Sequence, residues 1–249
     1  MKLKSFVTVL LGLAVLITPI FSIQAFAQDK ALIELSFSKK LALARAGDNS
    51  AKLAVAEAYE KGLGIRLNTA EAAKWYRQAA LAGVLDAQYR LALIVEKGAT
   101  GIKPDQNAAL KLLQAAANKG HAQSQWAFGQ RLHLGQGLPK DDKLAALWVH
   151  KAAEQGLAVA QNDYGSMLLH GWGTERNLDE AFKWFAKGAE QGDLWAMNNL
   201  GGMYEQGWGT PQDKAKAVEE YQSAAAKGNE GARKNLERLG LPVPVPTTP

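Results

Sequence analysis

Small and large apolar residues recur along this 249-residue chain at fixed distances before a glycine. In each copy small residues stand eleven and six positions before it, and large ones seven and three positions before it. The copies are Ala51, Val55, Ala56, Tyr59; Ala87, Leu91, Ala92, Val95; Ser124, Phe128, Gly129, Leu132; Ala160, Tyr164, Gly165, Leu168; and Ala196, Leu200, Gly201, Tyr204. Offsets of four, five and eight fall on one face of a helix with 3.6 residues per turn. The pattern predicts five amphipathic helices, one per copy, each called helix A.

A second helix, helix B, is predicted after each helix A. It opens with a side chain that can accept hydrogen bonds from free backbone N–H groups: Asn68, Asp105, Asp141, Asn177 and Asp213. Alanine follows four residues later, and then a bulky pair: Trp75 and Tyr76, Leu112 and Leu113, Trp148 and Val149, Trp184 and Phe185, with Tyr221 alone in the last copy. Alanine allows close approach of a neighbouring helix, so tightly packed helical hairpins are predicted.

Two series of glycines mark the ends of these helices. The loop glycines, Gly62, Gly98, Gly135, Gly171 and Gly207, end helix A, and four of the five continue as G-x-G. The second series, Gly83, Gly120, Gly156, Gly192 and Gly228, follows helix B at spacings of 37, 36, 36 and 36 residues. No strand is predicted before the G-x-G segments, so they are interpreted as turns and not as a dinucleotide-binding loop.

Taken together, these motifs resemble the Sel-one-like repeats, relatives of the tetratricopeptide repeats, over residues 47 to 228. The shared features are a helix A ending Y-x-x-G-x-G, an Asp-capped helix B with A-x-x-W-Y, and a terminal A-A-x-x-G. The second copy departs from them at Val95 and Leu112 and in a widened loop from Gly98 to Pro104. The resemblance implies an all-α fold, a right-handed α-solenoid, and a non-enzymatic protein-protein interaction module.

The domain boundaries follow from this repeat. We predict a signal peptide at 1–27, an N-terminal capping helix within 28–47, and a C-terminal capping helix at 230–240 before a flexible Pro-rich tail at 241–249. Between the caps lie five repeats, at 48–83, 84–120, 121–156, 157–192 and 193–228. Half-repeats at the two ends would shield the terminal faces of the stack.

The N-terminus has the features of an export signal. Lys2 and Lys4 precede an apolar run from Ser5 to Ile17, and an A-x-A site ends at Ala27. The alternative is a permanent membrane anchor, but the run is shorter than the roughly 20 residues that span a bilayer, and Pro19 interrupts it. We expect an exported bacterial protein, periplasmic or secreted, without membrane insertion after cleavage.

The amino-acid composition excludes several kinds of functional site. The absence of cysteine excludes disulfides, thiol nucleophiles and thiolate metal sites. The net charge of +5 includes Lys2 and Lys4, and the other basic residues are mixed with acidic ones, so no nucleic-acid partner is expected. The four histidines and the carboxylates form no catalytic or metal-binding spacing, so no catalytic residue, metal or cofactor is predicted. Two other functions are weighed: cell-wall glycan binding, and β-lactam binding or hydrolysis as in Cys-rich relatives. Those relatives have a disulfide in each repeat, and because this chain has no cysteine their activity does not carry over to it.

The candidate binding residues lie off the core face of helix A. Nine residues before the loop glycine stand Tyr89, Trp126, Asn162 and Asn198, and Gln130 and Ser166 follow one turn later on the same face. Aromatic residues next to amides are typical of a groove for a peptide. The alternative is that Tyr89 and Trp126 pack between repeats.

Two tryptophans mark a second candidate surface. Trp172 and Trp208 each stand in the middle of G-W-G in consecutive repeats, where exposed neighbouring rings would form a hot spot. The alternative places each ring over the loop of the next repeat. We predict a monomer that binds an envelope or secreted protein, whose identity the sequence does not give.

Overall fold

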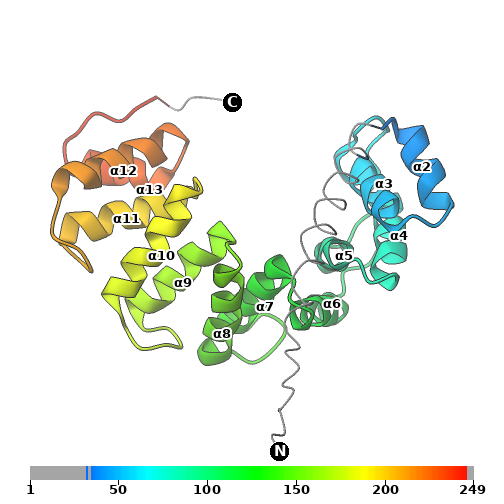
Figure 1. Cartoon of the computed structure of the whole chain (residues 1–249), viewed down its shortest axis with the longest axis horizontal. Coiled ribbons are helices and arrows are strands. Elements are labelled where there is room, and N and C mark those ends of the chain that lie inside the picture. The colour runs from blue at the N-terminus through cyan, green and yellow to red at the C-terminus, as the bar shows by residue number, and fades with distance from the viewer. Residues whose placement is uncertain (1–31, 33–34, 246–249) are drawn as a thin grey trace, which may run out of the picture. The chain divides into compact units, whose positions relative to one another are not determined.

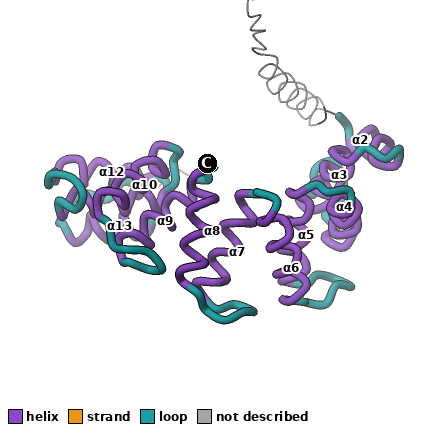
Figure 2. Tube along the Cα trace, turned by 60° about the horizontal axis from the view of Figure 1, so that its bottom comes forward, coloured by secondary structure: helices purple, strands orange, loops and turns teal. Residues whose placement is uncertain are grey.

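The computed structural model describes residues 32 and 35–245 (Figure 1). The predicted signal peptide and the last four residues of the tail lie outside this range. The helices are α2 (Phe37–Arg45), α3 (Asn49–Lys61), α4 (Thr69–Leu81), α5 (Leu85–Lys97), α6 (Gln106–Asn118), α7 (Ala122–Leu134), α8 (Asp142–Glu154), α9 (Ala158–His170), α10 (Leu178–Glu190), α11 (Leu194–Gln206), α12 (Lys214–Ala226) and α13 (Glu230–Arg238). Figure 2 shows helices and loops and no strand among the described residues. The predicted all-α fold is confirmed.

The chain divides into two compact units, residues 1–84 and 85–249. The described part of the first holds α2 and the helical pair of the first repeat, α3 and α4. The second holds the four other pairs and α13. Within each unit every helix packs on the next one in sequence, as in an α-solenoid.

The predicted caps of helix B form in all five repeats. Each side chain accepts a hydrogen bond from the backbone N–H three residues later. The distances are 3.1 Å for Asn68, 2.9 Å for Asp105, 2.9 Å for Asp141, 3.0 Å for Asn177 and 3.0 Å for Asp213. The five loop glycines have φ between 67° and 74°, in the left-handed region, so they end helix A as predicted.

The core lies between helix A and helix B of each repeat. The second residue of the bulky pair is at most 1% exposed in every copy: Tyr76, Leu113, Val149, Phe185 and Tyr221. It presses on the small residue six positions before the loop glycine. A Cβ at Gly129, Gly165 or Gly201 would lie 2.7 to 2.9 Å from Val149, Phe185 or Tyr221 respectively. The two patterns seen in the sequence therefore complement each other within one repeat.

Buried glutamines join successive helices of the second unit. The Gln125 amide donates to the Ala117 carbonyl of α6 at 3.2 Å and accepts from Gln155, at the end of α8, at 2.6 Å. One repeat later Gln161 donates to Ala153 at 3.3 Å and accepts from Gln191 at 2.7 Å. These contacts satisfy polar groups that burial would otherwise leave unpaired.

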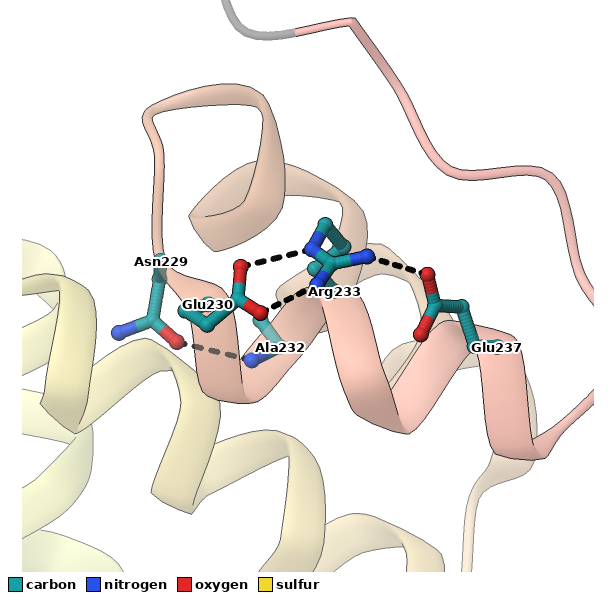
Figure 3. A network of polar contacts seen from close by, with 5 residues as sticks. All are labelled: Asn229, Glu230, Ala232, Arg233 and Glu237. Atoms are coloured by element: carbon teal, nitrogen blue, oxygen red, sulfur yellow. Dashed lines mark hydrogen bonds and ion pairs between the residues drawn. The ribbon is translucent and has the colours of Figure 1, made fainter.

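Each terminal helix covers one end of its unit. In the first unit, Phe37 of α2 meets Tyr59 edge to face, with ring centroids 5.2 Å apart. In the second, α13 is capped by Asn229, which accepts from the Ala232 N–H at 2.8 Å, and Arg233 bridges Glu230 and Glu237 along its exposed side (Figure 3).

A flexible tail was predicted from residue 241, but its first residues are packed. Leu241 and Val243 pack against the hydrophobic core of the second unit. The Leu241 N–H also donates to the Leu236 carbonyl at 3.0 Å. These residues therefore belong to the packed body.

Candidate functional site

A line of polar side chains crosses the helix-A face of the second unit. It begins on α7, where the indole N–H of Trp126 donates to Oδ2 of Asp163 on α9 at 2.6 Å, and the Gln130 amide donates to the same oxygen. The sequence placed Trp126 and Gln130 on one face, and the structure brings them together on Asp163.

Asparagines continue this line toward the C-terminus. Asn162 donates to Asp163 Oδ1 at 3.1 Å and accepts from Asn199 of α11 at 2.8 Å. Asn235 of α13 donates to Asn198 of α11 at 3.0 Å, and a longer contact of 3.5 Å joins Asn198 to Asn199. We call this set the helix-A ladder: Trp126, Gln130, Asn162, Asp163, Asn198, Asn199 and Asn235.

Members of the ladder differ in burial. Asn162 is only 7% exposed, so it is an internal link. Trp126 is half-buried and packs against the core, as the alternative interpretation held, while its N–H joins the ladder. Ser166 donates its hydroxyl proton to the Asn162 carbonyl of its own helix at 3.1 Å. Half-buried Asn198, Asn199 and Asn235 are the more accessible end.

Asp163 is the one carboxylate of the ladder. Burial raises the pKa of its carboxyl, hydrogen bonds from Trp126, Asn162 and Gln130 lower it, and the negative charge of Asp193 raises it further, with a net upward shift. Among the described residues no Lys, Arg or His forms an ion pair with it. Its charge is held by neutral donors alone.

A cleft of about 290 Å³ adjoins the C-terminal end of the ladder. Its walls are Leu169, Asn198, Asn199, Gly202, Met203, Glu205, Gln206, Trp208, Tyr221, Asn235 and Arg238. Two predicted site residues from different surfaces, Asn198 on helix A and Trp208 on the loop edge, therefore meet here. Trp208 is 39% exposed.

The charged groups of the cleft neutralise each other. Arg238 donates to Glu205 at 2.6 Å, and the Tyr221 hydroxyl donates to Glu205 at 2.8 Å. The Arg238 bond is the main cause that lowers the pKa of the Glu205 carboxyl, against burial and with help from Tyr221. Burial, followed by the bond to Glu205, raises the pKa of the Tyr221 hydroxyl far above its usual value.

Trp172 lies apart from this cleft. Its ring stacks on His170 at 4.4 Å between centroids and lies 5.2 Å from His133 of the preceding repeat, leaving it 42% exposed. A Cβ at Gly173 would lie 1.8 Å from the Asp142 carbonyl oxygen, so the G-W-G loop rests on the start of α8. The ring of Trp172 therefore packs toward the preceding repeat. The alternative derived from the sequence, that the ring lies over the loop of the next repeat, is wrong for Trp172.

Tyr89 is also separate. Its ring lies 5.7 Å from that of His121. His121 caps α7, because its Nδ1 accepts from the Ser124 N–H at 3.3 Å, and its Nε2 contacts Asp86 at 3.2 Å. Tyr89 thus packs beside a helix start.

Of the ladder residues, Asp163, Asn199 and Asn235 were not predicted as site residues, and neither was Arg238 of the cleft. Asp163, Asn199 and Asn235 recur every 36 residues, eight positions before the place of the loop glycine. The 36-residue spacing is visible in the sequence, but at position 243, where a loop glycine would mark the register of the terminal helix, the chain has valine. Arg238 has no periodic counterpart.

Two properties of the described residues bear on other functions. No three His, Asp or Glu side chains are grouped so as to hold a metal ion within that part of the chain. Across the same residues, every helix is too short or too polar to span a bilayer.

The repeats match a known family. The model of the Sel1 repeat matches residues 50–84, 85–121, 122–157, 158–193 and 196–229. No curated protein matches the chain. A Sel1 repeat protein from Oxalobacter formigenes is similar in structure, with a TM-score of 0.73 and 29% identity over 82% of this chain and 89% of that one.

Two other solved structures are informative. A protective antigen of uropathogenic Escherichia coli with an SLR fold has a TM-score of 0.73 and 30% identity over 84% of this chain, which spans only 45% of the antigen. An immunity protein from Pseudomonas aeruginosa, with a TM-score of 0.55 and 19% identity over 81% of each chain, shares the fold. The repeats, their sequence motifs and the helical pairs agree: this chain belongs to the Sel1 repeat family.

Proposed function

We propose that the chain is an exported, non-enzymatic interaction module that binds an envelope or secreted protein through the helix-A face of residues 85–249. Membership in a family of helical repeats supports a protein-interaction role, because such repeats offer an extended surface for a partner. The export features of residues 1–27 support a partner outside the cytoplasm.

The observation that carries the proposal is the meeting of the helix-A ladder with an exposed tryptophan at one cleft. An asparagine amide has two N–H groups and two acceptor lone pairs. Asn198 uses one of each within the ladder, so bonding capacity remains for a partner. Trp208 has no hydrogen-bond partner for its indole N–H in the described chain. Tryptophan beside such polar groups is typical of interface hot spots.

Capture from a periplasmic extract tests this proposal. The chain starting at Gln28 is immobilised as wild type, as Trp208→Ala and as Trp172→Ala. Trp172 is the matched control because it stands at the same place in the preceding G-W-G loop, is 42% exposed and does not line the cleft. Circular dichroism of each preparation checks the fold.

We expect wild type and Trp172→Ala to retain the same protein. Trp208→Ala should retain about tenfold less or lower still, since a hot-spot residue contributes about 2 kcal/mol or more. Full capture by Trp208→Ala together with loss in Trp172→Ala would place the interface elsewhere and refute the proposal.

A further inference from the structure

The ladder and the cleft have the dimensions of an extended chain. Asp163 lies on α9 and Asn235 on α13, so two steps from one helix A to the next separate them. At about 8 to 10 Å per helix neighbour, this distance is on the order of 20 Å. An extended peptide rises about 3.4 Å per residue, so about six residues cover it.

The polar groups along the ladder can form hydrogen bonds with a peptide main chain. Asn198, Asn199 and Asn235 are half-buried and each pairs with a neighbour in the ladder. Each amide keeps a donor or an acceptor, and a peptide main chain presents both kinds of group along its length.

The two ends of the ladder and cleft differ in charge: one has an unpaired carboxylate and the other has a neutralised ion pair. Asp163 has no cationic partner among the described residues, and Asp193 adds a second negative charge nearby. At the other end, Arg238 is already paired with Glu205. A lysine or arginine of a ligand would supply the missing counter-charge at Asp163, where low solvation strengthens the attraction.

A saccharide fits these observations less well. A glycan along the ladder would need aromatic faces on which to stack its rings. Trp126 packs against the core and directs its N–H to Asp163, which leaves Trp208 as the exposed ring of the cleft.

We infer that the helix-A ladder and the adjoining cleft bind an extended segment of the partner. A lysine or arginine of that segment lies against Asp163, and an apolar side chain further along the segment lies beside Trp208. The asparagines pair with the main chain between them. This inference rests on the proposed function and specifies the chemistry of its partner.

Selection from a displayed library of linear 12-residue peptides tests the inference with the folded chain from Gln28 onward. The selected peptides should share a basic residue and an apolar residue at one fixed spacing of at most about six positions. A synthetic peptide with the most frequent sequence is then measured by fluorescence polarisation, beside a second peptide in which norleucine replaces the basic residue.

The norleucine peptide should bind at least about tenfold more weakly, and this comparison needs no protein variant. Asp163→Asn should weaken the basic peptide similarly while leaving the norleucine peptide unchanged. Its matched control is Asp179→Asn, which removes an exposed carboxylate on α10 and should change neither affinity. Melting curves of both variants check their folding.

Equal affinity for the two peptides, or selected sequences without a basic residue, would overturn the inference. So would a library without binders while peptidoglycan saccharide fragments bind. If the wild-type chain still captures a partner in the periplasmic experiment, a negative library result refutes the extended peptide alone. If capture fails as well, the proposed function falls with it.

Discussion

At the scale of single residues, the distance between the two helices of a repeat depends on whether a Cβ is present at one position. Gly201 faces the Tyr221 ring, and an added Cβ would lie 2.7 Å from Cε1. The next residue, Gly202, faces more open space, where the nearest atom is the Tyr221 hydroxyl oxygen at 3.7 Å. Two adjacent glycines of one helix therefore have different roles.

We predict opposite effects of alanine at these two positions. Gly201→Ala should lower the free energy of unfolding by about 1 to 3 kcal/mol, because the buried ring cannot move away freely. Gly202→Ala should leave it unchanged or raise it by up to about 1 kcal/mol, since alanine favours a helix over glycine. Urea unfolding of both variants measures the difference, and equal destabilisation would show that the close approach of Tyr221 is not what Gly201 permits.

The residue pattern could be predicted in part from the sequence. The small and large positions of helix A and the caps of helix B were evident because they repeat in every copy. The partner of the small position was not, because either member of the bulky pair fits the spacing. Only packing shows that Phe185 and Tyr221 face Gly165 and Gly201. Asp163 was missed because a single carboxylate on a helix is usually solvated.

At the scale of elements, Glu205 joins three helices at the C-terminal end. It lies on α11 and is contacted by Tyr221 of α12 and Arg238 of α13. The side chain is 11% exposed, and its charge is stable there because both partners donate to it. This carboxylate therefore adds a polar link to the apolar contacts of Ala232 and Leu236 that hold the terminal helix in place.

This arrangement predicts a component of acid sensitivity. Since the folded-state pKa of Glu205 is lowered, its pairing stabilises the fold above the unfolded value of about 4.3, and this contribution is lost as the pH falls through the folded value. Glu205→Gln should therefore lose less stability than wild type between pH 7 and pH 3. Urea midpoints at the two pH values provide the measurement, and an equal loss in both proteins would exclude Glu205 as a source.

The C-terminal helix α13 also shows what could not be predicted from the sequence. The terminal helix was predicted at 230–240, and the structure has it at Glu230–Arg238. Its functional side chains were not predicted, because the role of Arg238 follows from the position of Glu205 in space and not from the repeat. The four G-x-G motifs and the five capping motifs specify local structure, whereas the ladder forms only when α7, α9, α11 and α13 are placed side by side.

At the scale of the whole molecule, the proposal combines a repeat surface with export. The described residues carry the surface, and residues 1–27 carry the export features. A partner in the envelope or outside the cell requires both. The location of the mature chain is therefore a separate test of the account.

We predict that the mature chain begins at Gln28, because the A-x-A site ends at Ala27. Intact-mass measurement of protein recovered from a periplasmic fraction provides the evidence. A mass that still includes residues 1–27, with the protein in the membrane fraction, would indicate an anchor and contradict this part of the proposal.

Site-specific photo-cross-linking tests most directly the claim that the helix-A face is the binding surface. A benzophenone amino acid replaces Gln206, an exposed residue of the cleft wall, or Leu147, an exposed residue of α8 that does not line it. Irradiation with the captured partner should give a cross-link from position 206 and none from position 147. A cross-link from position 147 alone, with both variants folded and binding, would show that the partner lies on another face and would contradict the account.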